Sequence, residues 1–367
     1  MKQYDSILIK GLKVSAYNIP TDAPEADGTI EWDSTTLVLV EVSAGNKTGI
    51  GYTYAHESAG LVIEKILKEI VVGKDAMNIP RISSSMIRGI RNNGQCGIAM
   101  MAVSAVDNAL WDLKAKILEL PLCILLGQAK DEMLIYGSGG FTSYSNAQTK
   151  KQFEGWASQS ITHFKMKVGS EPAKDADRVK AARKAIGDNA ELFVDANGAY
   201  TVKQALQKAQ EFTEYNVSWY EEPVTSANLK GLHFIRGHAP YEINIAAGEY
   251  GYTLPYFDKM LHAGAVDILQ ADATRCGGIS YYIKASFMAE AYQVPFSSHC
   301  APSLHLHASL ALPSFYIAEY FHDHVRIENM LFDGTPKPKG GSLHPDLSRP
   351  GLGLTFKQKD AEKYKIC

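Results

Sequence analysis

The chain has 367 residues, of which 46% are hydrophobic and 21% charged, and its net charge is −3. This length allows one large domain and a smaller one. The slightly acidic balance argues against a nucleic-acid-binding protein, which normally carries a basic excess or a basic stripe. The five cysteines are scattered and contain no CxxC pair, so they indicate neither a structural zinc site nor a secreted disulfide framework.

The N-terminal segment lacks the long apolar run of a signal peptide. No apolar stretch of the sequence is long enough to span a bilayer. We therefore expect a protein of the reducing cytoplasm that has neither a nucleic acid nor a membrane as its partner.

Residues 6–55 are expected to form β-structure. Residues 7–20 alternate apolar and polar side chains, residues 35–55 contain further strands, and SAGNKTG at 43–49 is typical of a hairpin turn. Between them, TDAPEADGTIEWDS at 21–34 predicts a polar loop with Pro and Gly, and long loops of this kind often act as lids. Residues 58–118 are expected to be helical, most clearly at 98–118. Together these segments predict a small α+β unit.

From about residue 132 the pattern changes to a strict alternation of strands and helices. Amphipathic segments separate most of the short apolar runs. Eight strand candidates with helices between them predict a (β/α) barrel. The candidates lie at 132–140, 163–169, 190–197, 216–223, 242–249, 265–272, 294–299 and 315–321.

Ionisable residues stand at the ends of seven successive strand candidates. Their spacings of 20 to 28 residues each fit one strand–helix unit, so each residue occupies the same place on its strand. In a barrel that place is the C-terminal rim, where active sites lie. The residues are Lys167, Asp195, Glu221, Glu249, Asp272, His299 and Glu319.

Asp195, Glu221 and Glu249 stand on three adjacent strands of the predicted barrel. Three converging carboxylates repel one another unless a cation neutralises them. A ligand set of oxygens alone suits a hard cation, Mg²⁺ before Mn²⁺. The alternative is that the three carboxylates pair with Lys or Arg side chains from neighbouring strands.

Asp272 and His299 end neighbouring strands, which is the arrangement of a carboxylate that orients an imidazole. Lys165 and Lys167 would face the cation and each other, and both effects lower a lysine pKa toward that of a general base. Lys167 on one side and His299 on the other suit removal of a proton alpha to a carboxylate. The metal would bind the carboxylate oxygens and stabilise the enediolate.

Three other histidines are interpreted as structural. His305 and His307 fit satisfied core positions, because a lone histidine in an apolar segment is more often packed than catalytic. His163 shares the face of the two lysines but is expected to lie too far back on its strand to act.

These motifs resemble the enolase superfamily, and within it the mandelate racemase subgroup of the acid-sugar dehydratase type. The matching stretches cover essentially the whole chain. They are KMK at 165–167, VDAN at 194–197, WYEEP at 219–223, AGE at 247–249, QADATRCGG at 270–278, SSH at 297–299, Glu319 in AEYF, and the helix AVSAVDNALWDLKAK at 102–116.

The resemblance implies an α+β capping domain at 1–130, a (β/α)₇β modified TIM barrel at 131–330, and a C-terminal segment at 331–367 that returns to the cap. It also implies a homo-oligomer and one Mg²⁺ per active site. The implied residue roles follow the motifs: Asp195, Glu221 and Glu249 as metal ligands, Lys167 and the His299–Asp272 dyad as the acid–base groups, Lys165 and Glu319 at the substrate carboxylate, and Asn197 beside the metal.

Glu222 follows a predicted ligand directly, and we interpret it as a structural ion pair rather than as a second ligand. The acidic residues of 21–34, with Tyr52, Tyr54 and His56, make the predicted lid polar, which suits substrate hydroxyl groups better than a phenyl ring. Glu25 and Tyr54 are therefore our candidates for substrate contacts, together with Asn197 beside the metal. The alternative interpretation of the acidic residues is a solvated loop surface.

The expected reaction is dehydration of a sugar acid with one carboxylate to a 2-keto-3-deoxy acid. The catalytic residues fit a racemase or epimerase of a 2-hydroxy acid equally well, because that reaction needs a base on each face of the carbon. A third interpretation is a class I aldolase, in which a strand lysine forms a Schiff base with the substrate. In that case the three carboxylates would have no role.

Overall fold

The computed structural model describes residues 5–367, and its first sheet comes from the N-terminal segment. β1 (Ile9–Ala26), β2 (Glu31–Ala44) and β3 (Lys47–Tyr54) form an antiparallel sheet in the order β1–β2–β3. On β2, Val38 and Val40 pack in the core under the cap helices, whereas Leu37 and Leu39 belong to the larger core on the barrel side. Because successive side chains of β2 point to opposite faces of the sheet, this strand contributes side chains to both hydrophobic cores.

The segment 21–34 is not the loop that we expected. β1 and β2 extend through most of it, so that only residues 27–30 form a turn, in which the Asp27 carboxylate accepts the N–H groups of Thr29 and Ile30. The register shifts between Pro20 and Glu25. A polar segment with Pro can remain a strand here because β1 is the edge of its sheet. At an edge, the N–H group that Pro lacks is not needed for a hydrogen bond to a neighbouring strand.

The predicted helical region 58–118 is confirmed. It contains α1 (Ser58–Val62), a π-helical turn (Ile63–Leu67), α2 (Lys68–Val71), α3 (Ile79–Gly89) and α4 (Ile98–Ile117), followed by α5 (Leu122–Leu126). α4 lies directly against β3. At Gly51 an added Cβ would stand 2.3 Å from both the Ala105 carbonyl oxygen and the Ala109 nitrogen.

Gly51→Ala is expected to lower the free energy of unfolding by about 1–3 kcal/mol, because backbone atoms of α4 leave no room for a methyl group. Urea denaturation followed by circular dichroism measures this change. The control is Gly155→Ala on the exposed surface of α6 (Asn146–Ala157), where an added Cβ would have no atom within 4 Å. This substitution should leave the free energy of unfolding unchanged or raise it slightly. An equal effect of both substitutions would contradict the close packing.

The barrel confirms all eight predicted strands. They lie side by side in chain order and close by pairing of the last with the first. The strands are β4 (Met133–Gly139), β5 (His163–Lys167), β6 (Glu191–Asp195), β7 (Val217–Glu221), β8 (Asn244–Ala247), β9 (Ile268–Ala271), β10 (Phe296–Ser298) and β11 (Phe315–Phe321).

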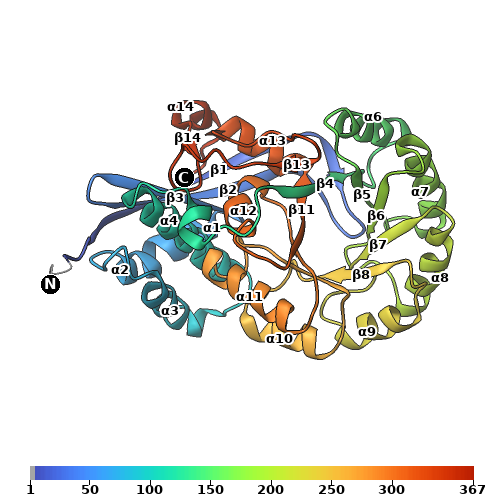
Figure 1. Cartoon of the computed structure of the whole chain (residues 1–367), viewed down its shortest axis with the longest axis horizontal. Coiled ribbons are helices and arrows are strands. Elements are labelled where there is room, and N and C mark those ends of the chain that lie inside the picture. Colours follow the sequence, from blue (N-terminus) through green and yellow to red (C-terminus); the bar gives the residue numbers. More distant parts are fainter. Residues whose placement is uncertain (1–4) are drawn as a thin grey trace.

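Helices follow each strand of the barrel and cover its outside (Figure 1). Besides α6 they are α7 (Pro172–Ile186), α8 (Val202–Thr213), α9 (Leu229–His238), α10 (Leu254–His262), α11 (Ile279–Ala291), α12 (Pro302–Ser309) and α13 (His322–Leu331). Inside the barrel, the rings of Tyr136, Phe193 and Trp219 pack together beneath the charged residues. No helix in residues 5–367 combines the length and the apolar character that a membrane crossing requires.

The C-terminal segment contacts both the barrel and the first sheet. β12 (Phe332–Asp333) pairs with β14 (Thr355–Phe356), and β13 (Ser342–Leu343) pairs with β4. After α14 (Gln358–Ala361) and a 3₁₀ turn (Glu362–Tyr364), Ile366 donates its N–H to the Ala16 carbonyl of β1. The C-terminus therefore lies beside the N-terminal sheet (Figure 1). The division at residues 130 and 330 stays a prediction.

Glu328 of α13 is a buried carboxyl group between the cap and the barrel. It accepts hydrogen bonds from the Tyr52 hydroxyl at 2.6 Å and from the Ser303 N–H at 3.1 Å. Burial outweighs these bonds and raises the pKa of Glu328 to about 7. Since the folded state binds this proton more tightly, the stabilising contribution is complete below about pH 4.5 and is lost as the pH rises through 7.

Glu328→Gln should therefore remove part of the pH dependence of stability. Relative to the variant, the wild type is expected to lose about 2–3 kcal/mol of unfolding free energy between pH 5 and pH 8. Urea denaturation of both proteins at these two pH values, in EDTA, measures the difference. Parallel pH profiles of the two proteins would show that Glu328 is ionised at pH 5 in the fold.

Candidate active site

The structure brings the seven strand-end residues to one end of the barrel. Lys167, Asp195 and Glu221 are the last residues of β5, β6 and β7, and the others lie at or near the ends of β8 to β11. A cavity of about 400 Å³ opens between this end and the cap. Of the seven residues, the cavity is lined by Lys167, Glu249, His299 and Glu319, whereas Asp195, Glu221 and Asp272 lie behind its surface.

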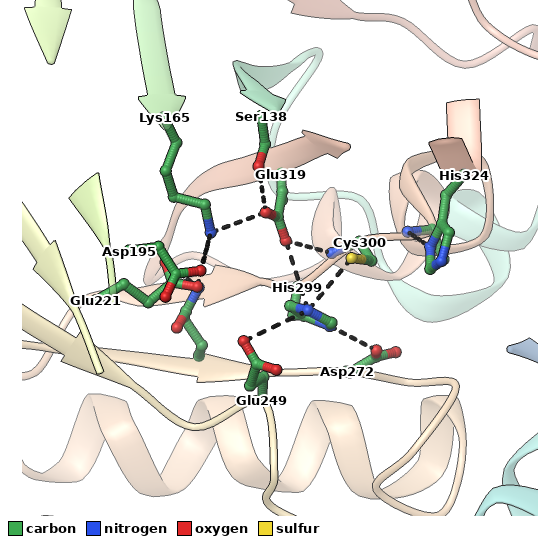
Figure 2. Close-up of polar contacts among 12 residues, drawn as sticks. Ser138, Lys165, Asp195, Glu221, Glu249, Asp272, His299, Cys300, Glu319 and His324 are labelled. Atoms are coloured by element: carbon green, nitrogen blue, oxygen red, sulfur yellow. Dashed lines mark hydrogen bonds and ion pairs between the residues drawn. The ribbon is translucent and has the colours of Figure 1, made fainter. Parts of the chain in front are cut away.

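Asp195, Glu221 and Glu249 form a compact group of carboxylates. One oxygen of each lies within 4.8 Å of the others, and all three side chains are buried. Figure 2 shows Asp195 and Glu221 on one side of the site and Asp272 on the other, with Glu249 next to His299, whose Nε2 lies 3.6 Å from Glu249 Oε2. Asp195, Glu221 and Glu249 are the three residues that we expected to bind Mg²⁺.

Lysines and an arginine contact the same carboxylates. Lys167 Nζ lies 2.5 Å from Asp195 Oδ2, and Lys165 Nζ lies 2.6 Å from Glu221 Oε1. Arg275 Nη1 lies 3.2 Å from Glu249 Oε1. The alternative interpretation of these carboxylates, pairing with neighbouring cations, therefore describes part of the site.

The negative charge of the site nevertheless exceeds its fixed positive charge. Two oxygens, Glu222 Oε1 and Glu249 Oε2, are buried without a hydrogen-bond partner. Unpaired buried carboxylate oxygens are costly, and a divalent cation would satisfy them. The donor set and the orphaned oxygens thus fit Mg²⁺. The carboxylates are Asp195, Glu221, Glu222, Glu249, Asp272 and Glu319, and the fixed cations are Lys165, Lys167 and Arg275.

The carboxylates in direct contact with the two lysines oppose the lowered lysine pKa values that we expected. Burial favours neutral amines, but Asp195 outweighs it at Lys167 and raises that pKa. At Lys165, Glu221 and Glu319 likewise outweigh burial and raise the pKa. The prediction counted a cation beside the lysines and omitted the carboxylates in direct contact with them.

His299 and Asp272 form the predicted dyad. His299 Nδ1 lies 2.8 Å from Asp272 Oδ2 and donates to it, so that Nε2 faces the cavity side. The hydrogen bond and charge of His299 outweigh burial and lower the pKa of Asp272. Asp272 is further fixed by the Thr274 N–H at 2.6 Å. A carboxylate held in this way fixes the orientation and the tautomer of the His299 ring.

Lys165 and Glu319 contact each other; Glu319 lines the cavity, and Lys165 lies beneath its surface. Lys165 Nζ lies 2.8 Å from Glu319 Oε1, which also accepts the Ser138 hydroxyl at 2.6 Å (Figure 2). The Cys300 N–H donates to Glu319 Oε2 at 2.9 Å. Lys165 is fully buried and does not line the cavity, and its charge helps to lower the pKa of Glu319 against burial. Glu319 is therefore an acceptor of hydrogen bonds at this place.

The three predicted substrate contacts are placed differently. Asn197 lines the cavity, and its Oδ1 is buried without a partner. Tyr54 also lines the cavity, stacked on His324 with ring centroids 3.4 Å apart. Glu25 does not line it, because its Oε2 turns away to accept the Trp32 indole N–H at 2.8 Å. The structure thus gives no support to a substrate contact by Glu25.

The acidic character that we expected of the lid is largely wrong. From the hairpin, the cavity is lined by Asp27, Ile30, Trp32 and the hydroxyl-bearing run Ser34–Thr36. The acidic side chains of Glu31 and Asp33 are exposed outside the cavity. Since successive strand residues alternate in direction, Glu31 and Asp33 point away from the face on which Trp32 and Ser34 line the cavity.

Glu222 is not the structural ion pair that we expected. It is buried, and residues 5–367 contain no cationic side chain in salt-bridge contact with it. Its backbone φ of +38° turns the chain sharply after β7. Burial and the nearby charges of Glu249 and Asp195 raise the pKa of Glu222 well above its usual value.

The histidines interpreted as structural lie outside the cavity. His305 is buried, accepts the Ala273 N–H on Nε2 at 2.8 Å and faces two backbone carbonyls with Nδ1. Burial lowers the pKa of His307 to about 4. His163 opens β5 at the end away from the site.

Sequence reasoning missed three residues that line the cavity. Arg275 contacts both Glu249 and Asp272, since its Nε lies 3.6 Å from Asp272 Oδ2. Its position three residues after Asp272 could have indicated from the sequence a cation near this carboxylate. Cys300 places its Sγ 3.2 Å from His299 Nε2. His324 in α13 gave no signal, because the fold alone brings it opposite Tyr54.

The fold and this site together define an acid–base enzyme with a divalent-metal site, built on a (β/α)₇β barrel with an N-terminal cap made mostly of sheet. Family models agree. Residues 148–361 match the enolase C-terminal domain-like family, and residues 14–127 match the mandelate racemase/muconate lactonizing enzyme N-terminal domain. The chain therefore belongs to the enolase superfamily, in its mandelate racemase subgroup.

Known proteins similar to the whole chain include two sugar-acid dehydratases. L-talarate/galactarate dehydratase of Salmonella typhimurium is 30% identical over 96% of this chain and 89% of its own length. A crystal structure of that enzyme with Mg and L-lyxarohydroxamate covers 100% of this chain and 96% of its own, with a TM-score of 0.90. Arabinonate dehydratase of Saccharolobus solfataricus is 30% identical over 89% of each chain.

A solved structure of higher identity comes from Rubrobacter xylanophilus. This mandelate racemase/muconate lactonizing enzyme-like protein is 51% identical, with a TM-score of 0.96. The alignment covers 98% of this chain and 99% of that one. The likeness thus extends over both the cap and the barrel.

Proposed function

We propose that this protein is a Mg²⁺-dependent dehydratase of a sugar acid with one carboxylate, which it converts to the 2-keto-3-deoxy acid. The observation that carries the proposal is one cavity with Lys167 and the His299–Asp272 dyad on it and the Asp195, Glu221 and Glu249 carboxylates at its base. Dehydratases among its relatives support the reaction type.

The three carboxylates would hold Mg²⁺, which when bound neutralises developing negative charge on a substrate carboxylate. Lys167 takes the alpha proton at Nζ. His299, protonated at Nε2 and held through Nδ1 by Asp272, gives a proton to the departing β-hydroxyl. Loss of the alpha proton and the hydroxyl as water leaves an enol, which becomes the 2-keto acid.

The charges that line the cavity favour a mono-acid. Within residues 5–367, the Lys and Arg side chains that line it are Lys167 and Arg275, and both already contact carboxylates. The wall formed by Ser34–Thr36 offers hydroxyl groups, which suit substrate hydroxyls better than a second carboxylate. Similarity does not decide this point, because the relatives named for galactarate, a diacid, and for arabinonate, a mono-acid, are equally identical to the chain.

A screen of aldonic and aldaric acids with Mg²⁺ tests the proposal, with semicarbazide detection of keto acids. We expect an aldonic acid to give the keto product. Turnover of aldaric acids alone would contradict the mono-acid assignment while leaving the dehydratase in place. Exchange of the alpha proton with solvent deuterium, without a keto product from any acid, would instead identify the racemase or epimerase that the same residues also fit.

The carboxylate group and the burial of Lys165 count against the Schiff-base alternative. A Schiff base needs an amine within reach of the substrate, and Lys165 is fully buried among Glu221 and Glu319 and does not line the cavity. The three carboxylates beside Lys167 would have no role in such a reaction. Borohydride trapping of substrate on either lysine, with activity that survives EDTA, would revive this alternative.

Homo-oligomerisation of the protein and its cytoplasmic location stay predictions.

A further inference from the structure

A second group of potential metal ligands lies outside the active-site cavity. It consists of Asp22 and Glu25 from β1 and of His322, which begins α13 directly after β11. One ligand atom of each lies within 4.8 Å of the others. His322 Nε2 stands 3.0 Å and 3.1 Å from the two carboxylate oxygens of Asp22. The group thus joins the cap hairpin to the barrel.

Glu25 is the unusual member of this group. Its side chain is fully buried, its Oε2 accepts the Trp32 indole, and its Oε1 has no partner. Within residues 5–367 no Lys or Arg forms a salt bridge with Glu25 or Asp22. The nearby Arg326 is already bound to Asp323 at 2.5 Å and to the Pro20 carbonyl at 2.6 Å. Burial of such a carboxylate without a counter-charge is costly.

Two further acidic side chains, Asp22 and Asp323, place negative charge near Glu25. A cation placed among Asp22, Glu25 and His322 would offset this charge and would satisfy the unpartnered Oε1 of Glu25.

We propose that Asp22, Glu25 and His322 bind a divalent transition-metal ion of the Zn²⁺ type, separate from the catalytic Mg²⁺ site. One imidazole with two carboxylates suits Zn²⁺, whereas Mg²⁺ prefers the oxygen-only set of Asp195, Glu221 and Glu249. His322 Nε2 and the Asp22 carboxylate oxygens are 3.0–3.1 Å apart, close to the edge of a tetrahedron with bonds of about 2.0 Å, and Glu25 has an oxygen within 4.8 Å of both groups.

The site has access to solvent and room for a water ligand. A cavity of about 380 Å³, lined in part by Asp22 and His322, opens beside it toward α6. The same ion would hold Trp32 through Glu25, and Trp32 lines the active-site cavity. On the barrel side, His322 follows the strand that carries Glu319. The metal thus fixes the hairpin over the active site.

Zn²⁺ titration by calorimetry tests this proposal on the full-length protein, after EDTA treatment and in excess Mg²⁺. We expect one Zn²⁺ per chain that Mg²⁺ does not displace. His322→Ala and Glu25→Gln should each weaken its binding by about 100-fold or more. Zn²⁺ should also raise the melting temperature of the wild type and not that of His322→Ala.

Three further variants distinguish this site from Zn²⁺ binding elsewhere on the protein. Asp33→Asn, an exposed acid of the same hairpin, should bind Zn²⁺ like the wild type. Cys300→Ala should also bind it, which separates the site from the His299, Cys300 and Glu319 group at the active site. Asp22→Asn, whose side chain is 48% exposed, should fold normally and still lose affinity. Absence of Zn²⁺ binding in Mg²⁺, binding unchanged by His322→Ala, or binding lost in Cys300→Ala would each overturn the proposal.

Discussion

Lys167→Met is expected to lower kcat by about 10²–10⁴-fold, the usual contribution of a positioned general base. The methionine side chain fills similar space at the cavity surface but cannot accept the alpha proton, and it leaves Asp195 without its partner at 2.5 Å. Steady-state assays with the acid found in the screen measure the loss. KM is expected to change less than kcat, because Lys167 acts mainly on the chemical step.

Lys180→Met on the exposed surface of α7 is the matched control and should retain full activity. Circular dichroism and the melting temperature of Lys167→Met establish that the variant is folded. A folded Lys167→Met enzyme with kcat within tenfold of the wild type would show that another group removes the proton.

Removal of the divalent metal is expected to abolish turnover, and Mg²⁺ should restore it. Glu249→Gln should weaken Mg²⁺ binding by at least about 100-fold, more than the loss of an outer hydrogen-bond partner usually costs. The amide keeps the shape of the side chain but removes a charge from the three-carboxylate group. Calorimetric titration of the EDTA-treated protein with Mg²⁺ measures the affinity without reference to activity.

Glu154→Gln on the exposed surface of α6 changes the same charge away from the site and should leave Mg²⁺ affinity unchanged. Wild-type Mg²⁺ affinity in Glu249→Gln would remove this residue from the ligand set. Full activity of the wild type in EDTA would remove metal from the reaction altogether.

The barrel and the order of its functional residues could be predicted because both depend on local periodicity. Seven successive strand candidates ended in an ionisable side chain, each one strand–helix unit after the previous one, which places these side chains on one rim in any closed parallel barrel. The hairpin at 21–34 could not be predicted in this way. Its strands are polar, and Pro24 is tolerated only because β1 is an edge, which is a property of the finished sheet.

The electrostatics of the site also depend on contacts that the sequence does not display. Lys167 and Asp195 are 28 residues apart, and their distance of 2.5 Å follows from the register of β5 and β6. Glu222 is left without a cation because a φ of +38° redirects the chain after β7. His324 reaches the cavity only through the packing of α13 against Tyr54. The three-dimensional packing of the chain, and not its local sequence, determines the contacts of Lys167, Glu222 and His324.

Exchange of the alpha proton in D₂O tests most directly the claim that Lys167 removes the alpha proton and that His299 protonates the departing β-hydroxyl. The measurement follows deuterium in remaining substrate and keto-acid formation for the wild type, Lys167→Met and His299→Asn. We predict that His299→Asn still exchanges the alpha proton without forming keto acid, because Lys167 remains in place. Lys167→Met should do neither. Exchange at the wild-type rate in Lys167→Met would contradict the role of Lys167 as the base.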